Sequence, residues 1–158
     1  MTRDSSRVDL AIEYARVDKL VPYGRNARTH SKQQVSQIAE SIKAFGFTNP
    51  VLIDRHNTII AGHGRVAAAR LLGMDRVPTI RLEGLSEDEI RSYVIADNRL
   101  AEKAGWDQSI LAIELQHLLT IDGNFDVTIT GFEVPEIDLI IEQARGQEPD
   151  KDVDNPAS

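Results

Sequence analysis

The chain has 158 residues, of which 41% are hydrophobic and 27% charged, with a net charge of −7 and no cysteine. This length is enough for one domain with a buried core and a tail, and the lack of cysteine excludes disulfides, a thiol nucleophile and a thiolate metal site. Because the sequence has neither a run of about 18 apolar residues nor a signal-like N-terminus, we expect a cytoplasmic protein that does not enter a membrane.

The first half of the chain alternates strand and helix signals. Short apolar runs bounded by turn residues predict strands over residues 11–17, 50–54, 58–61 and 77–82. Ser31, with Gln34 three residues later, predicts a capping box that opens a helix ending at Gly46. A glycine turn at 62–64 then leads into a second helix over 65–72.

The second half has mainly helical signals. Ser86 and Glu89 predict another capping box, for a helix to about Lys103, and Asp107 caps a helix to about Thr120. Residues 128–130 are predicted as a short extended segment, and Pro135 suits the first turn of a last helix reaching Ala144.

These elements predict an α+β fold, a small mixed sheet with helices packed on it, followed by a helical C-terminal part. We divide the chain into a flexible N-terminus (1–9), an α+β domain (10–105), a helical extension (106–145) and an acidic linker or tail (146–158).

Charge is spread unevenly along the sequence. The net charge argues against a chain that coats nucleic acid by bulk electrostatics. From residue 16 to residue 32, however, five Lys and Arg residues stand against one Asp. These cations predict weak, salt-dependent contacts with a DNA backbone, through Arg16, Lys19, Arg25, Arg28 and Lys32.

The strongest local motif is Gly62-His63-Gly64-Arg65, where a strand runs through two glycines into a helix. Glycine lets the backbone turn tightly and approach a ligand, and a helix N-terminus offers unpaired N–H groups to an anion. Arg65 adds a forked donor suited to phosphate. The alternative is a tight turn with a solvent-facing arginine. The motif is neither a Walker loop nor a dinucleotide fingerprint.

The order of motifs resembles the N-terminal domain of ParB chromosome-partition proteins, a branch of the ParB/sulfiredoxin superfamily. The matching segments span about residues 12–105, at 26–28, 47–53, 61–65, 72–73 and 77–78. In ParB the turn reads Gly-Glu-Arg-Arg and belongs to a CTP-binding pocket, to which a later Glu-Asn-x-x-Arg segment also contributes. The resemblance implies a site for a nucleoside triphosphate, CTP or ATP, with or without Mg²⁺. Its contacts here are Gly62, His63, Gly64, Arg65, Asn26, Arg28, Thr48, Asn49, Asn98 and Arg99.

Other branches of the superfamily are enzymes. The sulfiredoxin reaction needs a cysteine in the turn and is excluded. Relatives that phosphorylate serine carry a Gly-His-x-Arg turn similar to this one and need a carboxylate base. The candidate catalytic residues are therefore His63, Asp54 and Asp97, although both acids also suit ordinary turn or cap positions. The remaining histidines have no metal-ligand spacing, so we predict no metal site formed by the protein alone.

Residues 95–107 and 130–132 resemble the ParB-type domain that precedes phage-like DNA methyltransferases, and the acidic tail resembles the start of their linker. No methyltransferase motif is present. No second helix follows at the spacing of a helix-turn-helix, so we expect no sequence-specific DNA reading.

Three functions remain open. The first is a nucleotide-binding regulatory or DNA-associated module, either in front of a methyltransferase domain or as a stand-alone ParB-like protein. The second is an enzyme of the superfamily, with NTP hydrolysis, kinase-like transfer or nuclease activity. The third is a protein-docking domain without a ligand. A homodimer is compatible with each of them.

Overall fold

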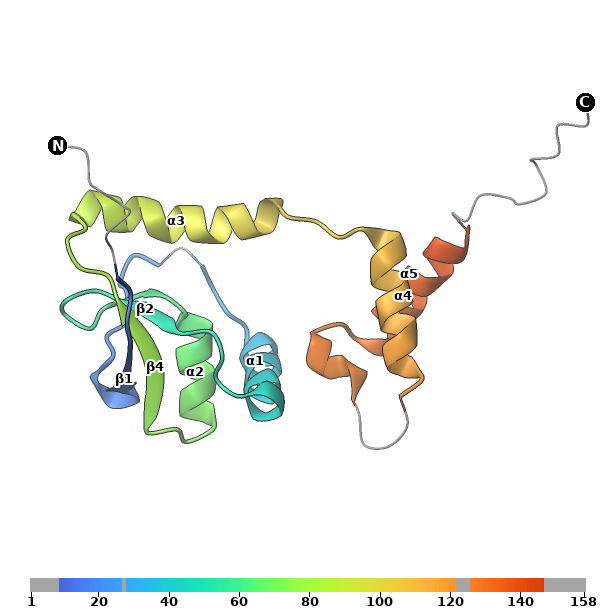
Figure 1. The fold of residues 1–158 in the computed structure, drawn as a ribbon, viewed down its shortest axis with the longest axis horizontal. Coiled ribbons are helices and arrows are strands. Elements are labelled where there is room, and N and C mark those ends of the chain that lie inside the picture. Colours follow the sequence, from blue (N-terminus) through green and yellow to red (C-terminus); the bar gives the residue numbers. More distant parts are fainter. Residues whose placement is uncertain (1–8, 27, 122–125, 147–158) are drawn as a thin grey trace, which may run out of the picture. The chain divides into compact units, whose positions relative to one another are not determined.

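The computed structural model describes residues 9–26, 28–121 and 126–146. The chain forms two compact units with a boundary between Ala104 and Gly105 (Figure 1). We call the first the sheet unit and the second the helical unit.

The sheet unit contains a mixed sheet of four strands, as the α+β prediction requires. The strands are β1 (Ile12–Arg16), β2 (Val51–Ile53), β3 (Ile59–Ala61) and β4 (Arg76–Arg81), in the order β1-β4-β2-β3. β4 pairs antiparallel with β1 and parallel with β2, and β3 pairs antiparallel with β2. A 3-10 helix, η2 (Val17–Lys19), follows β1.

Three helices complete this unit: α1 (Lys32–Phe45), α2 (His63–Leu71) and α3 (Glu87–Lys103). Helices α1 and α2 pack against each other, and α3 contacts β3 (Figure 1). The core between α2 and the strands is aliphatic, as the low aromatic content of the sequence suggested. It consists of Val17, Leu20, Val51, Ile53, Ile59, Val66, Ala69 and Val77.

The predicted capping boxes have different outcomes. In α3 the box is complete, because Ser86 Oγ accepts from the Glu89 N–H and the Glu89 side chain accepts from the Ser86 N–H. In α1, Ser31 Oγ accepts from the Gln34 N–H at 3.1 Å, but the Gln34 side chain bonds to His30 instead. The second half of that box was therefore wrong.

Helix α2 begins earlier than predicted. It starts at His63 rather than residue 65, so only Gly62 forms the turn, as a cap with φ of +108°. Since His63 and Gly64 lie in the first helical turn, their side-chain positions are set by a helix rather than by a loop.

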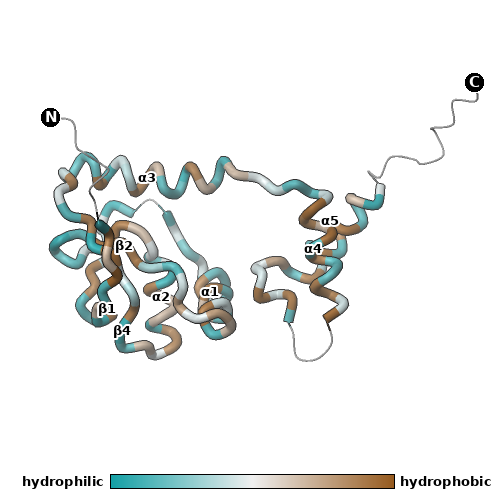
Figure 2. The backbone as a smooth tube through the Cα atoms, viewed as in Figure 1, coloured by the Kyte–Doolittle hydropathy of each residue, from teal (hydrophilic) through white to brown (hydrophobic). Residues whose placement is uncertain are grey.

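The helical unit contains α4 (Gln108–Leu119), the 3-10 helix η3 (Val127–Thr130) and α5 (Val134–Gly146). Its core is separate from that of the sheet unit, and Figure 2 shows a hydrophobic segment at α5. The core residues are Leu111, Ala112, Leu115, Val127, Ile137 and Ile141.

One expectation for this unit was wrong. Residues 128–130 are not extended, because Asp126 Oδ1 accepts from the Thr128 N–H at 2.9 Å and starts a 3-10 turn. Trp106 is 64% exposed and meets the edge of Phe132, with 5.7 Å between ring centroids. In the part of the chain that the structure describes, no helix is long and apolar enough to cross a membrane.

Candidate functional site

The glycine turn is built around the Arg65 side chain. A Cβ on Gly62 would lie 2.9 Å from Arg65 Nη2, so any other residue here would have to displace this guanidinium as well as adopt a positive φ. Arg65 Nη2 donates to the Pro50 carbonyl at 3.0 Å, and its Nε is buried without an acceptor among the described residues. Arg65 is thus half-buried, and the alternative of a solvent-facing arginine is wrong.

The electrostatic surroundings of Arg65 have opposing effects. Burial lowers the pKa of its guanidinium, while the carboxylate of Asp97 raises it. Asp97 also accepts a hydrogen bond from Tyr93, whose pKa is raised by burial and then by this carboxylate. Asp97 therefore stands near the only cation of the glycine motif without being paired to it within salt-bridge distance in the described residues.

Gly64 has a different reason to be glycine. It is buried, and a Cβ there would lie 2.9 Å from Ile38 Cδ1 and 3.1 Å from the His30 ring. The second glycine of the motif thus allows α2 to pack closely against α1, rather than allowing a ligand to approach the backbone.

A pocket of about 130 Å³ lies over this turn, which we call the turn pocket. It brings together most of the residues that the ParB resemblance implied, along with His30 and Ile38, which sequence reasoning did not assign. The implied residues that line it are Asn26, Arg28, Gly62, His63, Gly64, Arg65 and Asn98, and the catalytic candidate Asp97 lines it as well.

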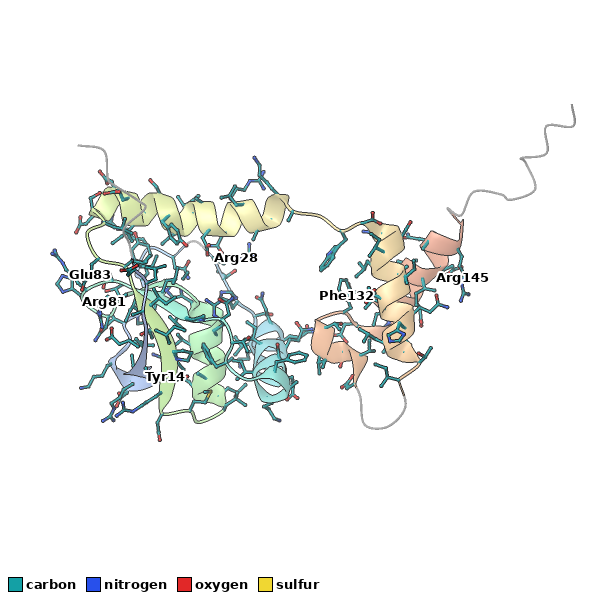
Figure 3. The ribbon with its side chains drawn as sticks, in the orientation of Figure 1. Tyr14, Arg28, Arg81, Glu83, Phe132 and Arg145 are labelled. Atoms are coloured by element: carbon teal, nitrogen blue, oxygen red, sulfur yellow. The ribbon has the colours of Figure 1, made fainter. Side chains whose placement is uncertain are left out.

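A larger cavity of about 440 Å³, which we call the arginine groove, lies between α3 and residues 23–26 and 28. We call these described residues the 23–28 loop. Figure 3 shows Arg28 beneath α3. The groove shares Arg28 and Asn98 with the turn pocket, so the two cavities have a common wall. Its residues are Tyr23, Arg25, Arg28, Arg91, Val94, Ile95, Asn98, Arg99 and Glu102.

One carboxylate partly offsets the four arginines of this groove. Glu102 pairs with Arg28, and its other oxygen lies 3.4 Å from Arg99 Nη1. Arg91 and Glu102 were not predicted, because nothing in their spacing along a helix shows that a distant loop packs over them.

His63 connects the turn to this loop. Its Nε2 accepts a hydrogen bond from the Tyr23 N–H at 3.1 Å. Burial, and then the neighbouring His30, lower the pKa of His63. A nitrogen that accepts an N–H must be unprotonated, so this contact requires the neutral ring with its proton on Nδ1.

The other predicted site residues either lie outside both cavities or form hydrogen bonds with the backbone of the fold. Thr48 and Asn49 are exposed in the loop before β2 and line neither cavity, although the adjacent Pro50 bonds to Arg65. Asn98 Nδ2 donates to the Val94 carbonyl of its own helix at 2.7 Å. Asp54 Oδ1 accepts from the N–H groups of His56 and Thr58, which is the ordinary role of a turn acid.

The predicted DNA-backbone residues have different partners and come from different elements. Arg16 pairs with Asp18 at 2.8 Å beside η2, whereas Arg25 lines the arginine groove. Lys19 ends η2 and Lys32 begins α1. Among residues 9–26, 28–121 and 126–146, no three His, Asp or Glu side chains form a group that could hold a metal ion.

Comparison with protein families gives two matches. Residues 2–98 match the model of the ParB N-terminal domain. Residues 109–158 match a model described as the ParB-methyltransferase HTH domain. The second match contradicts our expectation that no helix-turn-helix follows. We had required a second helix three or four residues after the first, but the segment between α4 and α5 is longer and contains η3.

Two curated relatives are similar in sequence. The ParB-like nuclease domain-containing protein YnaK of Escherichia coli K12 is 59% identical over 80 residues, covering 51% of this chain and 92% of that protein. The probable chromosome 2-partitioning protein ParB of Deinococcus radiodurans is 34% identical over 74 residues, covering 45% of this chain but only 25% of that protein.

Solved structures share the fold. ParB from Caulobacter crescentus, C-terminally truncated and complexed with CTP-γ-S, has a TM-score of 0.70 at 20% identity, covering 89% of this chain and 81% of that one. A pNOB8-like ParB-N domain has a TM-score of 0.50 at 17% identity, covering 69% and 44%. With a family match over most of the sheet unit and a relative matched along nearly its whole length, the chain belongs to the ParB N-terminal domain family.

Proposed function

We propose that this chain is a nucleoside-triphosphate-binding module of a DNA-associated protein, with the phosphates in the turn pocket and the nucleoside in the arginine groove. The observation that supports this most strongly is the shared wall of Arg28 and Asn98, since a single ligand can then occupy both cavities. The turn pocket has room for phosphate groups but not for a whole nucleotide.

The turn pocket has the donors that a phosphate needs. The first turn of α2 presents backbone N–H groups without intrahelical partners. The buried Nε of Arg65 is a further charged donor without an acceptor among the described residues, and a phosphate oxygen would satisfy it.

A triphosphate usually brings Mg²⁺, which binds to one or two carboxylates as well as the phosphates. Asp97 is the only carboxylate among the described residues that line the turn pocket, so it would hold the ion. The ion would neutralise phosphate charge. Asp97 is also the residue on which an NTP-hydrolysing or kinase-like activity would depend.

The arginine groove suits the nucleoside. Val94 and Ile95 give it apolar surface, and Tyr23 gives it an aromatic side chain on which a base can stack. CTP is the first candidate, because the Caulobacter ParB of the same fold was solved with CTP-γ-S.

The match to the ParB-methyltransferase HTH domain supports a DNA-associated role, in front of a methyltransferase domain or in a stand-alone protein. In this proposal the nucleotide regulates the protein by ordering the loop over α3.

The test is a calorimetric titration of the chain with CTP, ATP and GTP, each with and without Mg²⁺. We expect saturable binding of one triphosphate, strengthened by Mg²⁺. A variant with Asp97→Asn should lose the Mg²⁺ dependence but keep weak binding, and a phosphate-release assay then separates a switch from an enzyme. If none of the three nucleotides binds, the proposal is wrong and the docking function takes its place.

A further inference from the structure

The 23–28 loop supplies the side chains on which both cavities depend. Tyr23 and Arg25 line the arginine groove, Asn26 lines the turn pocket, and Arg28 lines both. Part of the loop's support is internal, because the Asn26 N–H donates to the Tyr23 carbonyl and the Arg28 N–H donates to Asn26 Oδ1. Such local bonds shape the loop but do not place it against the phosphate-binding turn.

Besides the ion pair between Arg28 and Glu102 of α3, one contact ties the loop to the first turn of α2. His63, the first residue of α2, accepts the Tyr23 N–H at its Nε2 from 40 positions along the chain. Because the bond involves the Tyr23 backbone, it holds the start of the loop whichever rotamer the tyrosine ring adopts.

We propose that His63 is a positioning residue, whose Nε2 holds the Tyr23 backbone, and with it the ring and arginines of the 23–28 loop, against the glycine turn. Its expected effect on ligand affinity rests on the proposed nucleotide function. Its effect on the loop does not, and can be measured without any ligand.

The surroundings of the ring fit this role. Besides His63 and Arg65 of α2, three charged or titratable groups line the same pocket. One comes from the loop, one from the segment before α1, and one from α3. They are Arg28, His30 and Asp97. Burial and His30 favour the neutral ring by lowering the pKa of His63, and the neutral ring is the form that can accept from Tyr23.

The experiment uses the full chain and three variants. His63→Ala removes the acceptor, while His63→Gln replaces it with an amide oxygen at a similar reach that does not titrate. His117→Gln is the matched control, because His117 is exposed on α4 in the helical unit. Alanine and glutamine are both good helix formers, so the first turn of α2 should tolerate either.

Two measurements are made on the ligand-free chain. A long-range ¹H–¹⁵N spectrum should show His63 neutral with its proton on Nδ1. The hydrogen-exchange protection of the Tyr23 amide should be lost in His63→Ala and retained in His63→Gln and His117→Gln. A proton on Nε2, or unchanged Tyr23 protection in His63→Ala, would overturn the proposal.

The third measurement is calorimetric affinity for the triphosphate that the wild-type chain binds. His63→Ala should weaken binding by about threefold to tenfold, as expected for one lost hydrogen bond, and His63→Gln should restore most of it. Equal loss in both variants, with Tyr23 still protected in His63→Gln, would make His63 a direct ligand contact and refute the positioning role. If the wild type binds no nucleotide, the proposed function fails, and the spectrum and exchange data still decide whether His63 holds the loop.

Discussion

The two units of the chain differ sharply in charge. Residues 1–104 contain 16 Lys and Arg against 13 Asp and Glu, a net charge of +3, whereas residues 105–158 contain 2 against 12, a net charge of −10. In the sheet unit four arginines line one groove, while Arg145 is the only Lys or Arg among the described residues of the helical unit.

This difference in charge shows that a family match and the capacity to bind DNA can point to different units. The helical unit matches a helix-turn-helix model, but affinity for DNA comes largely from cations that neutralise phosphates. Of the 18 Lys and Arg residues of this chain, 16 lie in the sheet unit. The match is a similarity of residues 109–158 to that family model, and from the charge we predict that any backbone contact with DNA is made by the sheet unit.

The largest expected effect tests whether the two units are independent. Ile137 is fully buried in the helical core, so Ile137→Ala should destabilise that unit by about 2–5 kcal/mol. Nucleotide binding by the sheet unit should persist. Thermal unfolding followed by circular dichroism, with calorimetry at 20 °C, measures both. Ile113→Ala is the control, because Ile113 on the same unit is 65% exposed and should change little. Loss of nucleotide binding in Ile137→Ala would show that the units are coupled.

The next effect compares one glycine from each unit. Gly62 and Gly131 both have positive φ, but only Gly62 has a side chain, that of Arg65, in the space of a Cβ. Gly62→Ala should cost about 1–3 kcal/mol and abolish nucleotide binding, whereas Gly131→Ala should cost about 1 kcal/mol and leave binding intact. Urea unfolding and calorimetry would show this, and equal costs would mean that the Arg65 side chain moves aside freely.

A smaller effect concerns DNA. Lys19→Ala together with Lys32→Ala should lower the slope of log affinity against log salt by about 2, since each phosphate contact contributes about 0.9. Arg145→Ala should leave the slope unchanged. Fluorescence anisotropy with a duplex over a range of salt concentrations measures it. The opposite pattern would place the DNA on the helical unit and contradict the charge argument.

The smallest effect is a pH dependence confined to the sheet unit. The folded pKa of His63 lies below its ordinary value of 6.5, so on acidification the unfolded chain takes up the proton first. The stabilisation is present above about pH 6.5 and is lost as the pH falls through the folded pKa. His63→Gln should remove this part of the pH dependence of unfolding, and His117→Gln should not. A His63→Gln curve that matches the wild type would refute the assignment.

Signals between residues close in the sequence predicted most of the helices and strands, but not which distant residues these elements bring into contact. The strands, the Ser86 box and the Asp107 cap follow from residues within four positions of one another, so they could be predicted. The role of Gly64 could not, because it depends on Ile38 and His30 from a different helix and loop. The arginine groove was missed for the same reason, since Arg91 and Glu102 meet Tyr23 only after folding.

The family resemblance predicted which residues line the turn pocket better than it predicted what those residues contact. Most of the implied residues do line it, whereas Thr48 and Asn49 do not. The Arg65→Ala substitution illustrates this, because the arginine has a structural partner as well as a proposed ligand. Because Arg65 donates to Pro50, that substitution would also remove a hydrogen bond to the residue before β2, so it cannot test phosphate binding alone.

The bond from Arg65 to Pro50 has a further consequence for how a ligand could be sensed. A guanidinium carries five N–H donors in one rigid plane, and the Pro50 carbonyl takes only one of them. A bound phosphate would therefore bond to the same guanidinium as Pro50, the residue that follows Thr48 and Asn49 in the loop. One side chain would thus connect a bound phosphate to the residue just before β2, so a ligand that moves the guanidinium would also change the hydrogen bond at Pro50.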